Sequence, residues 1–365
     1  MEFNPHMTHP SFPQLDPIGE PVYFLCEHMD RYRDVLDGVI PPDANAVFER
    51  FRDARDSWST QPFLQLLARG LDVHLTAKLV PGAINIAPYD QLRISARTYN
   101  SFVVCCRHDR GIPRIADAVI VQNEDNVYGA NDYYLPHWPQ PGLIGRPRDR
   151  GVTIKNLAYK GRKLNLAPAF RSPEFIATLQ NLGVTLAYSP DDEAARVRDC
   201  VDYQEVDVVL AVRDCTEYNL SIKPPSKLFN AWLAGCPAIL GPESAYRQLR
   251  RTELDYFEVR TPEEVVRCIE RLKREPGLYE AMVANGLERG REYTSDRTAE
   301  RWRDLLAGPI MRDFKLWKAS GVGASTLRRL SYPLHAAQHR MERRSFLHQI
   351  DHGPRPLRPT EAQKQ

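Results

Sequence analysis

Apolar residues fall in short runs that polar residues hardly interrupt, and these runs predict buried strands. The clearest runs are Val22–Cys26, Phe102–Cys106, Ala118–Val121, Val152–Tyr159 and Val206–Val212. A run without alternation is typical of a parallel strand that helices cover on both faces. We therefore expect parallel sheets.

A second pattern occurs three times: an amphipathic helix, a glycine and then an apolar strand. It lies at 62–79, 175–188 and 227–240. Glycine suits the left-handed conformation at a helix end, so each glycine marks the stop of its helix. Helices that alternate with parallel strands indicate a doubly wound α/β fold.

The stretch 135–151 is rich in proline, glycine and arginine, which is typical of a linker. It separates two units that are each long enough for an α/β domain. The predicted division is a disordered N-terminus over 1–20, an N-terminal Rossmann-like domain over 21–140, a C-terminal Rossmann-like domain over 141–310 and a basic helical tail over 311–365.

The charge of the 365-residue chain is nearly balanced at +2, which argues against nucleic acid as a partner. Residues 310–365, however, hold eleven Lys and Arg against four Asp and Glu, a local charge of +7. We expect 296–318 to pack back on the N-terminal domain. For 325–348 two interpretations stay open: packing on the protein, or peripheral attachment to an anionic membrane surface.

Seven cysteines, an odd number without a C-x-x-C pair, indicate reduced thiols and no metal site. No apolar run reaches the roughly 18 residues that suggest a membrane-spanning helix. The polar start of the chain lacks a signal-peptide core. We expect a cytoplasmic protein of bacterial type.

The most informative segment is 223–243. Pro224 and Pro225 end an extended stretch, and Ser226 stands where a helix N-cap belongs. Lys223 and Lys227 flank this helix start. Free backbone N–H groups and the helix dipole favour an anion there, which we expect to be a diphosphate.

Further basic residues follow other predicted strands, namely Lys160 and Arg162 after one and Arg213 after another. Strand ends of a parallel sheet share one edge, where ligands bind in this architecture. No convincing Asp-x-Asp follows a strand, so these fixed charges predict metal-independent stabilisation of a leaving phosphate. Asn230 and Glu243 are candidates for contacts with the donor's nucleoside or sugar.

The pattern Pro-x-Lys, helix, Gly-x-Pro-x-Ile-Leu-Gly-x-x-x-x-Tyr within 221–247 resembles the donor loop of GT-B glycosyltransferases. It is similar to that of bacterial family-4-like enzymes and of α1,3-fucosyltransferases. Residues 275–286 also resemble the helices that close such domains. The resemblance covers about 150–310 and is architectural over 20–135. It implies two domains that face a cleft and a nucleotide sugar as co-substrate, with no other cofactor.

Family-4-like enzymes carry two glutamates seven residues apart near this helix, whereas Ser226 or Lys227 stands here where an acid is expected. Glu243 is the nearby carboxylate, and it follows the strand. This departure favours an inverting reaction, which needs a general base. Asp109 or His108, at the end of an apolar run in the N-terminal domain, is the candidate; a surface loop of paired charges is the alternative.

The predicted function is glycosyl transfer from a nucleotide-activated donor to a saccharide or lipid-linked acceptor, as in polysaccharide biosynthesis. One alternative is a nucleotide-sugar 2-epimerase of the same architecture. Another is a non-catalytic GT-B-like protein that uses its basic tail at a membrane.

Overall fold

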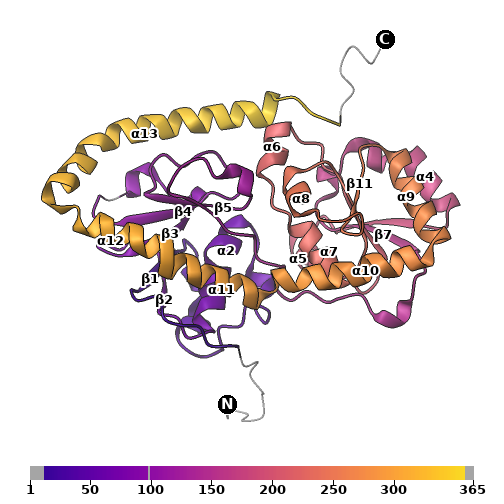
Figure 1. Ribbon diagram of the computed structural model, residues 1–365, viewed down its shortest axis with the longest axis horizontal. Helices are drawn as coiled ribbons and strands as arrows, with labels where there is room; N and C mark the ends of the chain where they lie inside the picture. Colours follow the sequence, from indigo (N-terminus) through magenta and orange to yellow (C-terminus); the bar gives the residue numbers. More distant parts are fainter. Residues whose placement is uncertain (1–11, 98, 358–365) are drawn as a thin grey trace.

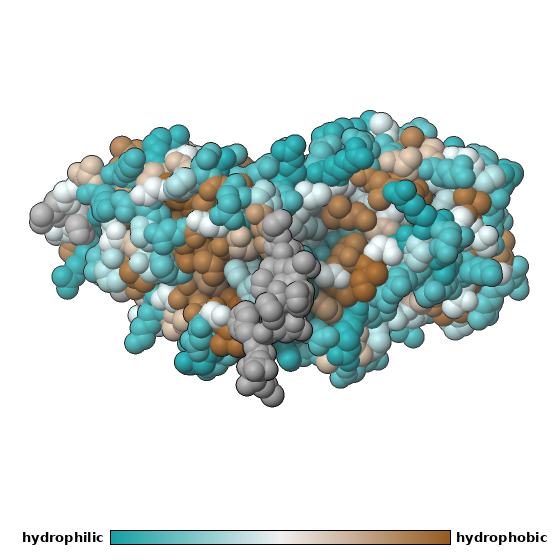
Figure 2. Space-filling model, turned by 90° about the horizontal axis from the view of Figure 1, so that it is seen from below, coloured by the Kyte–Doolittle hydropathy of each residue, from teal (hydrophilic) through white to brown (hydrophobic). Residues whose placement is uncertain are grey.

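Two α/β domains lie side by side, and long helices run along their common edges (Figure 1). The computed structural model describes residues 12–97 and 99–357. Each domain has its own apolar core around one sheet. Seen from below, the surface is mainly hydrophilic, and apolar residues gather near the junction of the two lobes (Figure 2).

The N-terminal sheet has the order β2-β1-β3-β4-β5-β6 within the described residues, and all its neighbouring strands are parallel. The strands are β1 (Val22–Leu25), β2 (Val73–Thr76), β3 (Ile84–Pro88), β4 (Phe102–Cys106), β5 (Ala118–Val121) and β6 (Asp132–Tyr134). Short helices α1 (Arg33–Leu36), α2 (Ala54–Trp58) and α3 (Thr60–Leu67) connect β1 with β2. The strand order reverses between β1 and β3, which opens a crevice at the carboxyl edge.

The C-terminal sheet, over the same described part of the chain, has the order β11-β10-β9-β7-β8 and is parallel too. Its strands are β7 (Asn156–Tyr159), β8 (Thr185–Tyr188), β9 (Val208–Ala211), β10 (Ala238–Leu240) and β11 (Phe257–Glu258). Its helices are α4 (Pro173–Asn181), α5 (Glu193–Val201), α6 (Glu217–Ile222), α7 (Ser226–Ala234), α8 (Ser244–Leu249), α9 (Pro262–Arg274) and α10 (Pro276–Gly290). The order reverses between β7 and β9.

These parallel sheets confirm the doubly wound α/β prediction. Strands β4 and β5 match the predicted apolar runs, whereas β1, β7 and β9 are shorter than theirs. Helix α7 corrects one detail, because Pro225 and not Ser226 occupies the N-cap position, and no side chain bonds the cap. The prolines fix the backbone that enters the helix, so Ser226 becomes its first residue. Gly235 ends α7 with φ of +70°, as predicted.

The chain returns to the N-terminal domain through α11 (Ser295–Leu305), a π-helical turn (Leu306–Ile310) and α12 (Met311–Ala319). Trp302 is fully buried there against the rings of Phe24, Trp58 and Trp138. The predicted packing of 296–318 on the N-terminal domain is therefore confirmed. The predicted domain limit at 310 is too late, because the apolar face of α11 already belongs to the N-terminal core.

The N-terminal segment that the sequence predicts to be disordered is only partly described, since residues 1–11 lie outside the described residues. Within 12–20, the amide of Leu15 donates to the carbonyl of Arg69 over 3.1 Å, and Ile18 is buried. This part of the segment therefore packs on the N-terminal domain.

Helix α13 (Gly321–His352) arches over the N-terminal domain and ends beside α6 of the other domain (Figure 1). Glu342 pairs with Arg114 over 2.6 Å, and Phe346 packs at Gly111. Beyond the helix, the amide of Glu217 donates to the carbonyl of Pro354 over 2.8 Å. The tail thus packs on both domains.

The outer face of α13 is left uncovered and carries exposed Leu327, Leu330, Leu334 and Met341. Over the part of the chain that the structure describes, no helix combines the length and apolar character needed to cross a bilayer.

Replacing Trp302 by alanine tests the joint core of α11 and the N-terminal domain. We expect a loss of roughly 3–5 kcal/mol in the free energy of unfolding, because a fully buried indole leaves a cavity. Denaturant unfolding measures it. Leu316→Ala, on the same return segment but 66% exposed, is the control; equal effects of both changes would contradict the assignment.

Candidate functional site

Residues from four segments meet at the carboxyl edge of the C-terminal sheet, and we call this group the Lys227 cluster: Tyr159, Arg213, Lys227 and Glu243. Arg213 follows β9, Glu243 follows β10 and Lys227 lies in the first turn of α7. The guanidinium of Arg213 pairs with the carboxylate of Glu243. The ammonium of Lys227 donates to the carbonyl of Lys160 and lies 5.0 Å from the centre of the Tyr159 ring.

Lys227 is half-buried, and its positive charge has no acidic partner among the described residues. Burial and the neighbouring charge of Arg213 lower its pKa to about 8. Among the described residues no carboxylate lies within ion-pair distance of its Nζ. A group in this state gains from a bound anion, since the anion supplies the missing opposite charge.

Gly161 keeps the space beside this lysine open. Its φ is +152°, and a Cβ built there would lie 3.3 Å from the Nζ of Lys227. Its amide donates to the hydroxyl of Ser189 over 2.8 Å. A side chain at this position would therefore press on the Lys227 ammonium.

The Arg213–Glu243 pair leaves one acceptor unused. Burial alone would lower the pKa of Arg213, but the carboxylate of Glu243 raises it above its usual value. Glu243 has no exposed surface, and its Oε1 is buried without a hydrogen-bond donor among the described residues. A ligand hydroxyl or amide would satisfy this oxygen.

The other candidate donor ligands lie outside the cluster. The ammonium of Lys160 pairs with Asp199 over 3.0 Å. Asn230 Oδ1 accepts from the amide of Gln140 over 3.1 Å and so holds the linker between the domains. Arg162 is exposed. Ser226 lines a pocket of about 200 Å³ that both domains enclose, and this pocket is the cleft between them.

The second group, which we call the His108 cluster, comprises His108, Asp109 and Lys223, and it joins the two domains. Asp109 Oδ1 lies 2.9 Å from His108 Nδ1, and Asp109 Oδ2 accepts from the ammonium of Lys223 over 2.7 Å. Burial would raise the pKa of Asp109, but His108 and Lys223 hold it well below its usual range. An ionised Asp109 therefore keeps the proton of His108 on Nδ1, which leaves a lone pair on Nε2.

His108 is held in an unusual conformation. Its φ is +38°, a left-handed value that costs a residue with a side chain about 1–3 kcal/mol. The side chain is 1% exposed, and Nε2 makes no hydrogen bond in the described part of the chain, with Asp90 Oδ2 at 3.7 Å. The candidate base is thus oriented by Asp109 and covered from solvent in this conformation.

Sequence reasoning missed two side-chain amides that form hydrogen bonds between the domains. Gln122 Nε2 donates to the carbonyl of Ile222 over 2.7 Å, and Asn123 Nδ2 donates to that of Lys223 over 2.9 Å. Both follow β5 at the carboxyl edge of the N-terminal sheet. Their position directly after a strand could have marked them as candidates. The sequence did not predict which loop of the other domain they would contact.

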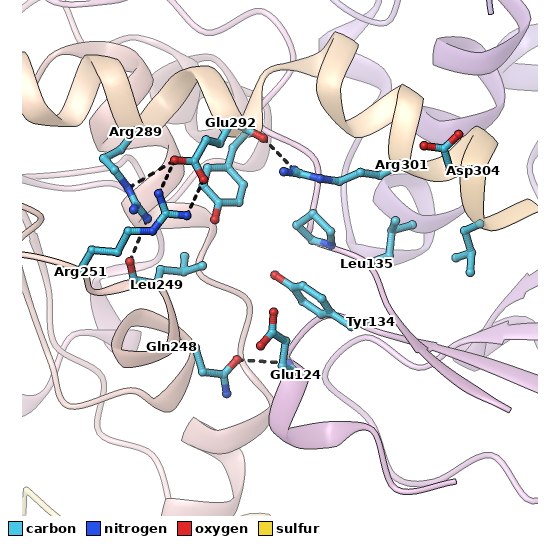
Figure 3. A pocket seen from close by; sticks show the side chains of 13 residues that line it. Glu124, Tyr134, Leu135, Gln248, Leu249, Arg251, Arg289, Glu292, Arg301 and Asp304 are labelled. Atoms are coloured by element: carbon cyan, nitrogen blue, oxygen red, sulfur yellow. Dashed lines mark hydrogen bonds and ion pairs between the residues drawn. The ribbon is translucent and has the colours of Figure 1, made fainter. Parts of the chain in front are cut away.

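A separate pocket of about 420 Å³ lies where the chain crosses between the domains (Figure 3). Glu292 pairs there with Arg251 over 2.7 Å, and its carbonyl accepts from Arg301 over 2.7 Å. Acidic and basic side chains balance in its lining, which differs from the positive Lys227 cluster.

A family model described as glycosyl transferase-like matches residues 184–304, the segment that holds Arg213, Lys223, Lys227 and Glu243. No curated protein sequence matches the chain.

Several solved structures are similar to it. Sucrose-phosphate synthase from Thermosynechococcus elongatus is 15% identical, with 65% of this chain and 74% of that chain covered and a TM-score of 0.44. TarM from S. aureus is 12% identical (61% and 55% covered, TM-score 0.43), and HepE from Anabaena with UDP and glucose is 10% identical (79% and 100%, TM-score 0.46). This chain spans little more than half of TarM.

Two parallel α/β domains that face a cleft, with a helical C-terminal extension, make the GT-B fold, as the sequence predicts. Three residues of the Lys227 cluster, Arg213, Lys227 and Glu243, lie within the segment that is similar to the glycosyl transferase-like family model. The likeness to α1,3-fucosyltransferases that the sequence suggests stays a prediction.

Replacing Lys227 by methionine tests the buried charge. The folded pKa of about 8 lies below the ordinary value of 10.5, so the unfolded chain holds more protons between these values and stability rises with pH across that range. At pH 7 the protonated lysine destabilises the fold, and Lys227→Met should add roughly 1–3 kcal/mol to the free energy of unfolding.

Chemical denaturation between pH 7 and 10.5 measures both effects. Lys163→Met, at an exposed lysine beside the Tyr188 ring, is the matched control. An unchanged pH slope in Lys227→Met would show that this ammonium is not the buried charge.

Proposed function

We propose that this protein is a glycosyltransferase that moves a sugar from a nucleotide-activated donor to a saccharide or lipid-linked acceptor. The observation that carries the proposal is the half-buried ammonium of Lys227, which has no acidic partner among the described residues and stands at the start of α7 beside Arg213. Backbone N–H groups and the helix dipole add to this positive potential. A donor diphosphate supplies the charge that the site lacks.

Transfer requires that the leaving nucleoside phosphate be stabilised as its bond to the sugar breaks. Lys227 and Arg213 are fixed charges in a buried setting, and each such group is worth about 10²–10³ in rate. We propose that this stabilisation is metal-independent. We assign Glu243 Oε1, which has no donor among the described residues, to a ribose hydroxyl; because Glu243 is fully buried, the loops around it must open for this contact.

The other residues that the sequence assigns to donor binding do not lie in the Lys227 cluster, and some must move before they can contact a donor. Lys223 must leave Asp109 before it can reach a phosphate. Arg162 is exposed at the loop that follows β7, and Ser226 faces the interdomain pocket. Lys160 and Asn230 act mainly by holding Asp199 and the linker in place.

We assign the general base of an inverting reaction to the His108–Asp109 pair. His108 Nε2 takes the proton of the acceptor hydroxyl, the oxygen bonds to the anomeric carbon, and the bond from that carbon to the phosphate oxygen breaks on the opposite face. Asp109 fixes the tautomer and stabilises the imidazolium that forms. The Asp90–Arg110 pair must move aside, since it covers Nε2.

The cell location is proposed to be the cytoplasm, with attachment to an anionic membrane surface through 325–348. The exposed leucines of α13 and the arginines around them support this proposal.

Release of free nucleotide only when an acceptor is added would separate glycosyl transfer from a 2-epimerase and from a non-catalytic protein.

Nucleotide binding is tested by thermal shift with UDP, GDP and their sugars. We expect at least one diphosphate to stabilise the wild type, and Lys227→Ala to weaken its binding by about ten- to a hundredfold, because a charge-assisted contact is lost. Binding to the wild type should decline above pH about 8, where Lys227 loses its proton. No shift with any nucleotide would reject the donor site.

The base is tested by His108→Asn, since asparagine tolerates a left-handed φ and should preserve the fold. We expect transfer to fall by about 10²–10⁴-fold while nucleotide binding stays unchanged. Asp109→Asn should act in the same direction. Full activity of His108→Asn would remove His108 from the mechanism.

A further inference from the structure

A cavity of about 900 Å³ lies between α13 and the carboxyl edge of the N-terminal sheet, and we call it the α13 groove. Its inner wall follows β3 and β4 and includes Tyr89, Asp90 and Arg110. Its outer wall is the inner face of α13, with His339, Arg343 and Phe346. The groove is separate from the Lys227 cluster.

The groove is positively charged. Arg93 pairs with Glu27 over 2.6 Å, and Arg110 pairs with Asp90 over 2.9 Å. Arg340 and Arg343 also line it, and neither has a carboxylate partner in the described part of the chain. Two guanidiniums thus remain for an anionic ligand, and guanidinium matches phosphate oxygens in geometry.

Two buried polar atoms at the groove have no partner. The hydroxyl of Tyr89 and the Nδ1 of His339 make no hydrogen bond within the described residues, although their residues are only 8% and 6% exposed. Burial lowers the pKa of His339, whose ring bonds the backbone of Ile112, so the ring is neutral and Nδ1 is an acceptor. Buried polar atoms are normally satisfied, so these two favour a ligand with both acceptor and donor groups, which would reach them once the side chains that now cover them move.

The rest of the lining is apolar, with Leu92, Ile94, Phe346, Leu347 and Ile350. Leu92 and Phe346 are buried, whereas Leu347 is 45% exposed. The apolar wall therefore continues from the charged part of the groove to the surface. A ligand that fits both parts has an anionic head and an apolar chain.

The groove ends beside the proposed base, because Asp90, which lines it, lies 3.7 Å from His108 Nε2. We infer that the α13 groove binds the sugar acceptor, and that this acceptor is an amphiphile whose head carries a phosphate and hydroxyl groups. Arg340, Arg343 and Tyr89 hold the phosphate, and the apolar chain lies along α13. This inference rests on the proposed glycosyl transfer.

Binding of dodecyl phosphate to the full chain, below its micelle concentration, tests the groove by calorimetry. We expect binding that exceeds that of inorganic phosphate and of dodecyl maltoside. Arg340→Gln/Arg343→Gln should weaken it by about tenfold or more. Tyr89→Phe, which removes only an unpartnered hydroxyl, should weaken it severalfold without loss of stability.

Arg329→Gln/Arg344→Gln removes the same charge from exposed positions of α13 outside the groove and is the matched control. Equal weakening by both double variants, or equal binding of either reference compound, would overturn the inference. Binding to anionic vesicles distinguishes a bilayer from a single amphiphile as the ligand. The inference would also be overturned if both double variants lost vesicle binding equally while both still bound dodecyl phosphate.

The test also separates the groove from the donor site. UDP binding should be the same in the wild type and in Arg340→Gln/Arg343→Gln, because Lys227 is untouched. Dodecyl phosphate binding without any nucleotide binding would reject the proposed function but leave the groove as a ligand site. Nucleotide binding without dodecyl phosphate binding would reject the groove alone.

Discussion

The carboxyl edges of two parallel sheets meet at the domain junction, and the positions of the charged groups follow from this arrangement. Right-handed crossovers place helices on the faces of such sheets, so the loops after the strands converge at one edge. Lys227, Arg213 and Glu243 are brought together in this way from separate parts of the chain. Packing around them leaves the two positive charges only partly accessible to water.

The two domains are joined by contacts of different kinds. The cleft side has polar contacts, such as Lys223 with Asp109 and Asn123 with the backbone of Lys223. Trp302, on the segment that returns to the N-terminal domain, is instead sealed in an apolar core. Breaking a polar contact costs little net free energy, because water replaces the partner. Opening an apolar core costs more, because its side chains become exposed to water. Motion of the domains should therefore open the cleft while α11 and α12 stay attached.

Helix α13 links the unusual features of the N-terminal half. Its inner face forms one wall of a charged, partly apolar groove, and the opposite wall leads through Asp90 to His108. The strained backbone of His108 and its Nε2 without a hydrogen bond both cost stability. Such features are typical of residues that serve a function and not the stability of the fold. Under the proposed function, the donor and acceptor sites lie on different domains.

The sequence by itself determined the parallel strands, the helix that starts at 226 and the left-handed Gly235, because these depend on local apolar pattern and backbone preference. It also indicated Lys227 and the His108–Asp109 pair as candidate functional groups in the segments that follow strands. Only the tertiary structure decided that Asn230 binds the linker, that Lys160 pairs with Asp199 and that Lys223 meets Asp109. The partner of a long polar side chain depends on which distant loop packs beside it, and no local pattern encodes that.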